Sequence, residues 1–290
     1  MEYFNDKLDI YPIGFNNTGC NCYFNSTLQL LTSCTSFIES IIKWRKYLSQ
    51  TKLGILMVEY AISVQQNTVD PTISIRILKQ LKQELRIRKP HINFGVGQDS
   101  AGEAIIHLLD MLEVPGSDFE ISPITLLFEH RVNKFVYCEN CKKITATKFD
   151  TSVAFNDFNI DKPSLLFDNY QNTKLQDYKC DICKNENVCN LLESLTVVPE
   201  IIVMRFNIYD HQNRKVNTLK ESFTIPGTTD IYTYKLLGYV EHSGTLNGGH
   251  YWATCMRKKE VYILNDMSVN KSTFRPSANI YLAIYHVFKE

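Results

Sequence analysis

Two cysteines lie two residues apart near the start of the chain, in the stretch GFNNTGCNCYFNSTLQLL (residues 14–31). Apolar residues recur at helical spacing from Phe24 onward, which places the start of a helix near Cys22 and leaves Cys20 in the preceding loop. The free N–H groups at a helix start favour negative charge, so they lower the pKa of a thiol placed there. The spacing predicts a nucleophilic thiolate at Cys22, whereas a buried structural cysteine at a helix start is the plainer interpretation of the same residues.

A cysteine nucleophile requires a histidine base that a third group orients. His250, one of seven histidines, follows a glycine pair and opens a predicted strand in NGGHYWATCM. A second predicted strand, VYILND, ends at Asn265 and Asp266, and a hairpin through the RKKE turn would bring these two side chains beside the imidazole. His242, in VEHSG, is the alternative base, and a surface histidine is the plainer interpretation of either one.

The loop before Cys22 carries other groups that could take part in chemistry. Asn16 and Asn17 supply amides just upstream of the predicted nucleophile, where an amide can donate to a developing oxyanion. Cys20 has two interpretations. Its thiol would capture an oxidised Cys22 as a disulfide, or its side chain only fills space beneath the loop.

Two further cysteine pairs have the spacing of a metal site. Cys138 and Cys141 form CENC, and Cys180 and Cys183 form CDIC. Four thiolates from two C-x-x-C turns are typical of tetrahedral zinc that is closed to water, so we expect one structural Zn²⁺ per chain and no organic cofactor. The alternative is four unconnected thiols, and Cys189 is near enough in the sequence to be mistaken for a ligand.

The elements that must position these residues change in character along the chain. The first 120 residues have helical periodicity, whereas period-two patterns rich in β-branched and aromatic residues follow from about residue 124. Asp70 before Pro71 predicts a helix N-cap, and Ser100 with Glu103 predicts a capping box. Helices followed by strands favour an α+β fold, with residues 156–178 as an irregular insert.

Composition argues against several classes of function and location. The chain of 290 residues has a formal net charge of zero, which argues against a nucleic-acid partner and a zinc-finger nucleic-acid protein. The most apolar window, GILMVEYAISV, is too short to span a bilayer, and the first ten residues do not resemble a signal peptide. We therefore expect no membrane insertion and a cytoplasmic or nuclear location, where thiols stay reduced.

The motifs resemble those of one family, the ubiquitin-specific proteases. Residues 14–31 resemble its cysteine box, and GYVEHSGTLNGGHYWATCM followed by VYILNDMSV resembles its histidine box. The two C-x-x-C pairs resemble its zinc-bearing fingers, and GQDSAGEAIIHLLDML resembles the helix between the boxes. The resemblance runs in order from about Ile13 to Val287.

The resemblance implies a role for each candidate catalytic residue. It places the nucleophile at Cys22, the general base at His250 and the third member of the triad at Asn265. It places the amide of the oxyanion hole at Asn17. Asp266 is expected to add negative charge at the imidazole, or at the oxyanion site through a water.

The implied architecture is a papain-like cysteine protease in a single catalytic domain over residues 1–290. A helical thumb would take residues 1–122, zinc-bearing β fingers mainly 123–195, and a β-rich palm mainly 196–290. The implied reaction is hydrolysis of the isopeptide or peptide bond after the C-terminal glycine of ubiquitin. The partners would be ubiquitin or polyubiquitin conjugates, and we expect a monomer.

Four residues are expected to contact the substrate: Asp99, Glu103, His242 and Tyr251. An acid at the start of the helix between the boxes meets arginines of the ubiquitin tail in the family. Alignment on Glu103 puts Ser100 at the usual aspartate, with Asp99 one residue earlier. Two other functions stay open, a protease for a ubiquitin-like modifier and a catalytically weak ubiquitin-binding module of the same fold.

Overall fold

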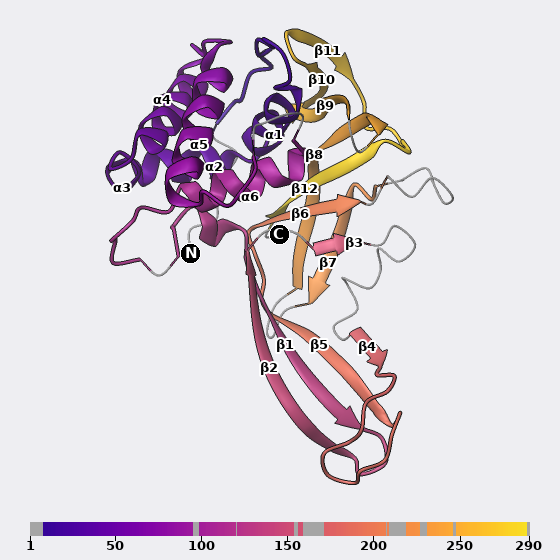
Figure 1. The fold of residues 1–290 in the computed structure, drawn as a ribbon. Helices are drawn as coiled ribbons and strands as arrows, with labels where there is room; N and C mark the ends of the chain where they lie inside the picture. Colours follow the sequence, from indigo (N-terminus) through magenta and orange to yellow (C-terminus); the bar gives the residue numbers. More distant parts are fainter. Residues whose placement is uncertain are drawn as a thin grey trace.

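The structure is a computed structural model. It describes residues 8–94, 99–119, 121–153, 156–158, 171–206, 208, 219–226, 231–245 and 248–288. Within them the helices precede the strands, in the order that the sequence patterns predict (Figure 1). The helices are α1 (Cys22–Thr32), α2 (Thr35–Lys43), α3 (Arg45–Leu48), α4 (Lys52–Gln66), α5 (Ile73–Arg88) and α6 (Ala101–Met111), with a 3₁₀ turn η1 (Thr125–Leu127).

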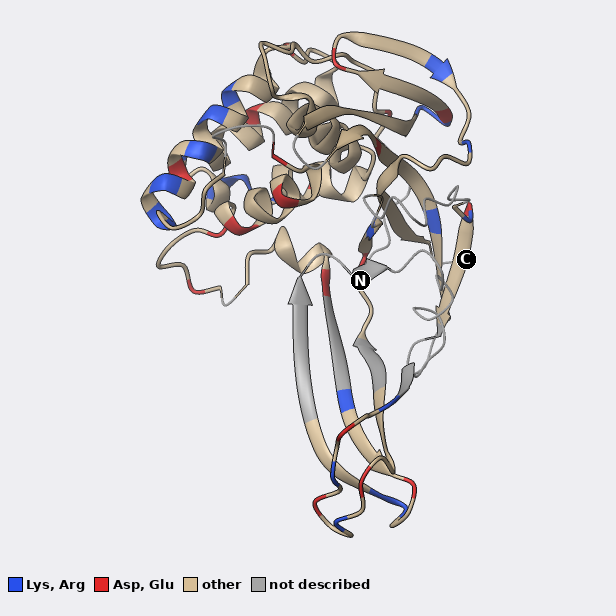
Figure 2. Cartoon of the chain, turned by 45° about the vertical axis from the view of Figure 1, so that its right-hand side comes forward, with Lys and Arg blue, Asp and Glu red and all other residues tan. Residues whose placement is uncertain are grey.

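Helix α1 lies at the centre of the molecule. All 11 of its residues are buried, because it packs against α2, α5 and α6 and also against the strands of the larger sheet. Figure 1 shows it between the other helices and that sheet. The outer helices face solvent, and residues 43–89 carry ten Lys and Arg against three Asp and Glu (Figure 2). The charged surface of the helical part is thus on the side away from the sheet.

Side chains that satisfy backbone groups fix the helix ends. The predicted capping box is present at α6, where Ser100 Oγ accepts from the Glu103 N–H at 3.0 Å. At α4, Thr51 Oγ1 accepts from the Gly54 N–H at 3.0 Å, and Asn67 ends the helix in the left-handed conformation (φ 55°). Each contact satisfies a group that a helix end leaves without an intrahelical partner.

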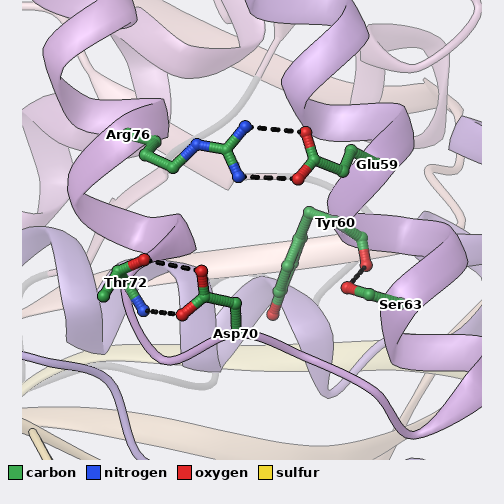
Figure 3. Close-up of polar contacts among 6 residues, drawn as sticks. All are labelled: Glu59, Tyr60, Ser63, Asp70, Thr72 and Arg76. Atoms are coloured by element: carbon green, nitrogen blue, oxygen red, sulfur yellow. Dashed lines mark hydrogen bonds and ion pairs between the residues drawn. The ribbon is translucent and has the colours of Figure 1, made fainter.

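The start of α5 differs from the prediction by two residues. Thr72, and not Asp70, occupies the N-cap position. The Asp70 carboxylate accepts from the Thr72 N–H (2.8 Å) and from its hydroxyl (2.7 Å), which lowers the pKa of Asp70 (Figure 3). Asp70 therefore organises the turn that enters the helix. One turn further on, Arg76 forms a bidentate ion pair with Glu59 that links α5 to α4 (Figure 3).

The larger sheet has the strand order β11-β10-β9-β8-β12-β6-β3, with β7 paired to β8. Its pairs are antiparallel except for β3 with β6. The strands are β3 (Asn156–Phe158), β6 (Ile201–Phe206), β7 (Ser222–Pro226), β8 (Ile231–Thr245), β9 (Gly248–Arg257), β10 (Glu260–Asn265), β11 (Ser268–Ser272) and β12 (Ile280–Phe288). Strands β8 to β10 contact α1, which brings the predicted histidine and cysteine segments together.

The smaller sheet extends away from the rest of the molecule as a long arm (Figure 1). Its order is β2-β1-β5-β4, from β1 (Glu129–Cys138), β2 (Lys143–Val153), β4 (Gln171–Lys174) and β5 (Cys189–Val197). Lys, Arg, Asp and Glu are mixed at its tip (Figure 2). The sheet matches the predicted fingers, except that β3 lies in their sequence range but pairs with the larger sheet. Residues 159–170 of the predicted insert lie outside the described residues.

The fold is therefore α+β, with a helical part, a β-rich part and an extended arm, as predicted. None of the helices in the described part of the chain has the length and apolar character needed to cross a bilayer.

Candidate active site

Cys22 is the first residue of α1, where the periodicity places it. Its side chain lies at a buried position, with 3% of the residue exposed. The preceding residue, Asn21, has no side-chain capping bond to the helix. Its Nδ2 donates instead to Asn16 O (3.1 Å), and its Oδ1 accepts from the Thr18 N–H (3.0 Å). The amide of Asn21 thus holds the loop that leads into Cys22.

A β-hairpin presents the histidine. Strands β9 and β10 pair in antiparallel fashion through a two-residue turn at Lys258 and Lys259, whose φ angles are 47° and 66°. Such a turn matches the twist of the strands. It brings His250 Nε2 to 2.7 Å from Asn265 Oδ1, as the predicted hairpin requires. Because an amide oxygen only accepts, Nε2 carries the hydrogen, and Nδ1 of the neutral ring is left to accept a proton.

The environment of the Cys22 thiol corrects one prediction. Burial raises the pKa of Cys22 above its ordinary value, and the charge of Asp266 raises it further. Backbone N–H groups of Tyr251, Tyr23 and Cys22 itself lower this pKa, but by less than burial and Asp266 together raise it. The predicted lowering of the pKa by the helix start is therefore wrong in the resting structure. The thiol keeps its proton at neutral pH until a base removes it.

Asp266 links the cysteine segment to the histidine segment. Its Oδ2 accepts from Asn17 Nδ2 at 2.8 Å, and its Oδ1 accepts from Asn25 Nδ2 at 2.7 Å. Both carboxylate oxygens are thus used by amides of the loop and of α1. An amide nitrogen has two hydrogens, so Asn17 keeps one for another acceptor. This arrangement places the charge of Asp266 beside Asn17, the amide predicted for the oxyanion hole.

Backbone contacts bring the loop close to the β10–β11 turn. The Phe15 N–H donates to Asp266 O at 2.9 Å. A Cβ atom on Gly14 would lie 2.6 Å from Met267 O, so only glycine allows this approach. Asp266 itself has a φ of 48°, in the left-handed region. The glycine that begins the loop and the turn that ends β10 therefore position Asn17 and Asp266 together.

The four predicted zinc ligands meet at the tip of the arm. Their Sγ atoms all lie within 4.8 Å of one another: Cys138, Cys141, Cys180 and Cys183. Cys138 Sγ lies 3.7 Å from Cys183 Sγ, and Cys141 Sγ lies 3.6 Å from Cys180 Sγ. Zinc–sulfur bonds of about 2.3 Å in a tetrahedron separate the sulfurs by roughly 3.8 Å, so the thiols fit this ion.

Each C-x-x-C pair forms the same turn. The Cys141 N–H faces Cys138 Sγ at 3.5 Å, and the Cys183 N–H faces Cys180 Sγ at the same distance. The lysine that follows each pair has a positive φ, 53° at residue 142 and 61° at residue 184. Cys189 is buried opposite Cys138 in the β1–β5 pair and is not one of the four.

Comparison with known proteins identifies the family. The family model described as ubiquitin carboxyl-terminal hydrolase matches residues 13–285. The chain belongs to the ubiquitin carboxyl-terminal hydrolase family. Among curated members, a probable ubiquitin carboxyl-terminal hydrolase 16 from Schizosaccharomyces pombe is 24% identical over 286 residues, covering 87% of this chain and 61% of that protein. Ubiquitin carboxyl-terminal hydrolase 26 from Oryza sativa is 26% identical, covering 83% of this chain and 24% of that protein. The chain thus spans at most about three fifths of these relatives.

Solved structures support the same fold. A chain of the SAGA DUB module, which contains Ubp8, Sgf11, Sus1 and Sgf73 bound to monoubiquitin, superposes with a TM-score of 0.72. The identity is 18%, and the match covers 96% of this chain and 69% of that chain. A second structure of the module, bound to ubiquitin aldehyde, gives the same score. The arrangement of helices, larger sheet and arm is therefore the fold of this hydrolase family.

The two candidate bases lie in different surroundings. His242 is buried, with 2% exposed, and its ring centroid is 4.2 Å from that of Tyr251. A Cβ on Gly249 would lie 2.3 Å from His242 Nε2, so the ring packs directly beneath the backbone that leads to His250. His250 and not His242 pairs with Asn265. The Tyr251 side chain is also buried (4% exposed), and its backbone N–H is the group that reaches Cys22.

The predicted tail-binding acids lie at the start of α6. Glu103 Oε2 accepts from the Ser100 backbone N–H at 3.4 Å and completes the capping box, but the residue is exposed. Asp99 lies near the buried Tyr23, where its charge adds to the rise that burial causes in the pKa of Tyr23. Its Oδ2 is buried without a hydrogen-bond partner in the described structure.

Sequence reasoning missed two buried polar residues beside α1. Asn25 holds the Asp266 carboxylate, and Arg257 contacts the far end of the helix. A signal for each was present in the sequence. Asn25 is a polar residue three positions after Cys22, one helical turn into α1. Arg257 keeps the inward phase of β9, in alternation with Tyr251, Ala253 and Cys255.

Proposed function

We propose that this chain is a deubiquitinating cysteine protease that hydrolyses the isopeptide or peptide bond after the C-terminal glycine of ubiquitin. The observation that carries the proposal is the pair of His250 Nε2 and Asn265 Oδ1, 2.7 Å apart, on a hairpin that packs against the helix start at Cys22. The family and the ubiquitin complexes of the related SAGA module support ubiquitin as the substrate.

The raised pKa of Cys22 makes His250 indispensable as a base. A buried thiol beside the negative charge of Asp266 is a poor nucleophile until its proton leaves. His250 Nδ1 takes this proton, while Asn265 keeps Nε2 protonated and fixes the ring. The thiolate attacks the carbonyl carbon of the terminal glycine, and the imidazolium then returns the proton to the departing lysine amine. Water hydrolyses the thioester that remains.

The oxyanion of the tetrahedral intermediate needs donors that are already in place. The second N–H of the Asn17 amide is one, because Asp266 holds the same nitrogen at 2.8 Å. The backbone N–H groups of Cys22 and Tyr23, at the open end of α1, lie beside the thiol and add to the field. Asp266 thus fixes Asn17.

The tip of the arm would hold one structural zinc ion through Cys138, Cys141, Cys180 and Cys183. Four thiolates complete a tetrahedral shell, so the ion would stabilise the two turns and supply no catalytic water. The arm, the helical part and the larger sheet would together hold ubiquitin. Asp99 and Glu103 would attract the arginines of its tail through their negative charge.

Further properties of the chain are proposed from its thiols and its size. All nine cysteines are free thiols, which fits a reducing cytoplasmic or nuclear compartment. The protein would work as a monomer, since each residue assigned a role in the reaction belongs to one chain.

A panel of activity probes tests this function. Each probe carries a C-terminal electrophile on ubiquitin or on a ubiquitin-like modifier and reacts only with a competent nucleophile. We expect a covalent adduct with the ubiquitin probe, at Cys22 by mass spectrometry, and none with Cys22→Ala. An adduct only with another modifier would replace ubiquitin as the substrate. Tight ubiquitin binding without any adduct would support the non-catalytic binding module instead.

A further inference from the structure

Arg257 is the largest fully buried side chain of the described structure, with 1% of the residue exposed. A buried guanidinium requires hydrogen-bond acceptors for its N–H groups, because solvent is excluded. Nη1 donates to Ser33 Oγ (3.0 Å) and to Met256 O (2.9 Å). Nη2 donates to the backbone oxygen of Gln29 (2.8 Å) and to its side-chain Oε1 (2.9 Å). All of these acceptors are neutral oxygens.

The position of the guanidinium explains how a cation is stable there. Gln29 lies in the last turn of α1, and Ser33 is the C-cap residue of the same helix. The carbonyl groups at a helix C-terminus carry partial negative charge, and cations are favoured beside them. The end of α1 therefore serves as the counter-charge of Arg257. In return, the three guanidinium hydrogen bonds to Ser33 and Gln29 set where this end can lie on β9.

The two elements that Arg257 joins carry the nucleophile and the base. Helix α1 starts at Cys22, and β9 carries His250 near its own start. At the first end of α1, the thiol faces the backbone N–H of Tyr251. Further along, Cys255 Sγ lies 3.7 Å from Gln29 O, and Arg257 closes the far end. If α1 shifted along β9 by the rise of one strand residue, the thiol would move by about 3.3 Å relative to the imidazole.

Gln29 extends this contact to a third segment. While its Oε1 accepts from Arg257, its Nε2 donates to Ile13 O at 2.6 Å. Ile13 immediately precedes Gly14, where the loop with Asn17 begins. One amide thus connects the strand of the base, the helix of the nucleophile and the loop of the oxyanion donor.

We propose that Arg257 is a positioning residue that sets the register of α1 on β9 and thereby places the Cys22 thiol against the His250 imidazole. Through its hydrogen bond to Ile13, Gln29 also positions the loop that carries Asn17. The proposal rests on the proposed function only where substrate turnover is measured.

Arg257→Lys tests the register while it keeps the positive charge. A lysine has one nitrogen and cannot reach Gln29 and Ser33 in the same geometry as the guanidinium. We expect kcat on ubiquitin with a fluorogenic C-terminal leaving group to fall by about tenfold or more, because small misplacements of reacting groups are costly. KM should stay within about twofold of the wild-type value, since no ubiquitin contact is changed.

A second measurement reads the register without ubiquitin. The rate of alkylation of Cys22 by iodoacetamide is measured against pH by mass spectrometry. The protein with Arg257 and the Arg257→Lys variant both carry Cys20→Ser, so that Cys22 is the one thiol left in the peptide that spans positions 20–22. We expect the midpoint of the Arg257→Lys profile to move to higher pH, because a displaced imidazole removes the proton of the thiol less readily. If the wild-type protein does not cleave ubiquitin, but Arg257→Lys still moves the alkylation midpoint, the proposed function is wrong and the positioning role stands.

Two further variants make the outcome decisive. Leu81→Ala removes a fully buried side chain of α5 and serves as the control for lost stability. If Arg257→Lys lowers only the melting temperature, as Leu81→Ala should, and leaves kcat and the alkylation midpoint unchanged, the positioning role is wrong. Gln29→Glu keeps an acceptor for Arg257 but loses the donor to Ile13. It should lower kcat without moving the midpoint, and an unchanged kcat would refute the link to the Asn17 loop.

Discussion

Cysteines lie in two different settings in this molecule, at the tip of the arm and at the start of α1. At both sites backbone N–H groups face a sulfur atom: the Cys141 N–H faces Cys138, and the Tyr251 N–H faces Cys22. At the tip, four sulfurs gather within 4.8 Å, as a closed tetrahedral shell requires. At the helix start a single buried thiol faces a histidine strand and a carboxylate. The neighbours, and not the cysteine itself, separate metal binding from nucleophilic chemistry.

The two sites also differ in how far apart their parts lie along the chain. Each metal-binding turn is made by four consecutive residues, so half of that site forms locally. The candidate active site combines a loop, a helix start and a hairpin, and the contact between Asn17 and Asp266 joins residues 249 positions apart. This site therefore depends on the packing of the whole domain, whereas the tip forms from two turns.

The largest expected effect separates the two thiol sites by activity. Cys22→Ala should reduce ubiquitin cleavage by about 10⁴-fold or more, because it removes the nucleophile. It should leave ubiquitin binding and the melting temperature nearly unchanged. Cys180→Ser should do the reverse, with lost zinc, a lower melting temperature and weaker binding but residual chemistry on bound substrate. Metal analysis, calorimetry and single-turnover kinetics on both proteins measure this contrast.

Two results would contradict this contrast between the thiol at the start of α1 and the thiols at the tip of the arm. One is a Cys22→Ala protein with near wild-type turnover. The other is a purified wild-type protein that contains no zinc and is unaffected by a chelator. Cys34→Ala is a suitable control, because this buried thiol belongs to neither site.

The pH dependence of Cys22 follows from its raised pKa. A raised pKa means that the neutral thiol persists to higher pH, so alkylation of an unassisted Cys22 should become fast only above pH 9, the ordinary value for the thiol. His250→Ala creates this condition, whereas the wild-type protein should react near neutral pH through its base. Iodoacetamide rates between pH 6 and 10 test the difference. Equal profiles for the two proteins would mean that His250 does not take the proton.

Local features of the site could be predicted from the sequence because short spacing fixes them. The helix start at Cys22 follows from the phase of the apolar residues, and the RKKE turn fixes the register that brings His250 to Asn265. Strands without a clear period-two pattern are of a different kind. Two examples, β2 (KITATKFDTSV) and β11 (SVNKS), are polar and lie at sheet edges, so their apolar alternation is weak.

Long-range contacts account for what the sequence could not predict. Nothing in the loop or the hairpin alone indicates that Asp266 binds both Asn17 and Asn25. The direction of the Cys22 pKa shift also depends on long-range packing. Burial raises this pKa only once α1 is packed inside the domain. The guanidinium of Arg257 could be assigned to the core from its phase, but its partners at the end of α1 could not.

A smaller loss of activity is expected from changes at the predicted oxyanion amide and its partner. Asn17→Ala should lower kcat by about 10²- to 10³-fold, the usual cost of one oxyanion donor. Asp266→Asn should cost less, because the loop keeps the Phe15–Asp266 backbone contact while the amide of Asn17 loses its anchor. Glu59→Gln replaces a carboxylate that also accepts two hydrogen bonds but joins the outer helices α4 and α5, so kcat should not change. An Asp266→Asn protein with unchanged kcat would show that Asn17 does not need this anchor.

The smallest effect that we predict separates recognition from stability at the start of α6. Glu103 closes the capping box with Ser100, worth about 1 kcal/mol of helix stability, and glutamine can close the same box. An arginine of the ubiquitin tail, in contrast, needs the charge, and a charge-assisted hydrogen bond is worth about 1.5–3 kcal/mol. Glu103→Gln should therefore raise KM for ubiquitin by roughly tenfold at an unchanged melting temperature, since 1.4 kcal/mol corresponds to tenfold. Glu84→Gln, on the outer helix α5, should change neither quantity. If KM does not respond to Glu103→Gln, the residue serves only the helix cap, and tail recognition at this end of α6 falls to Asp99, whose buried Oδ2 has no hydrogen-bond partner in the described structure.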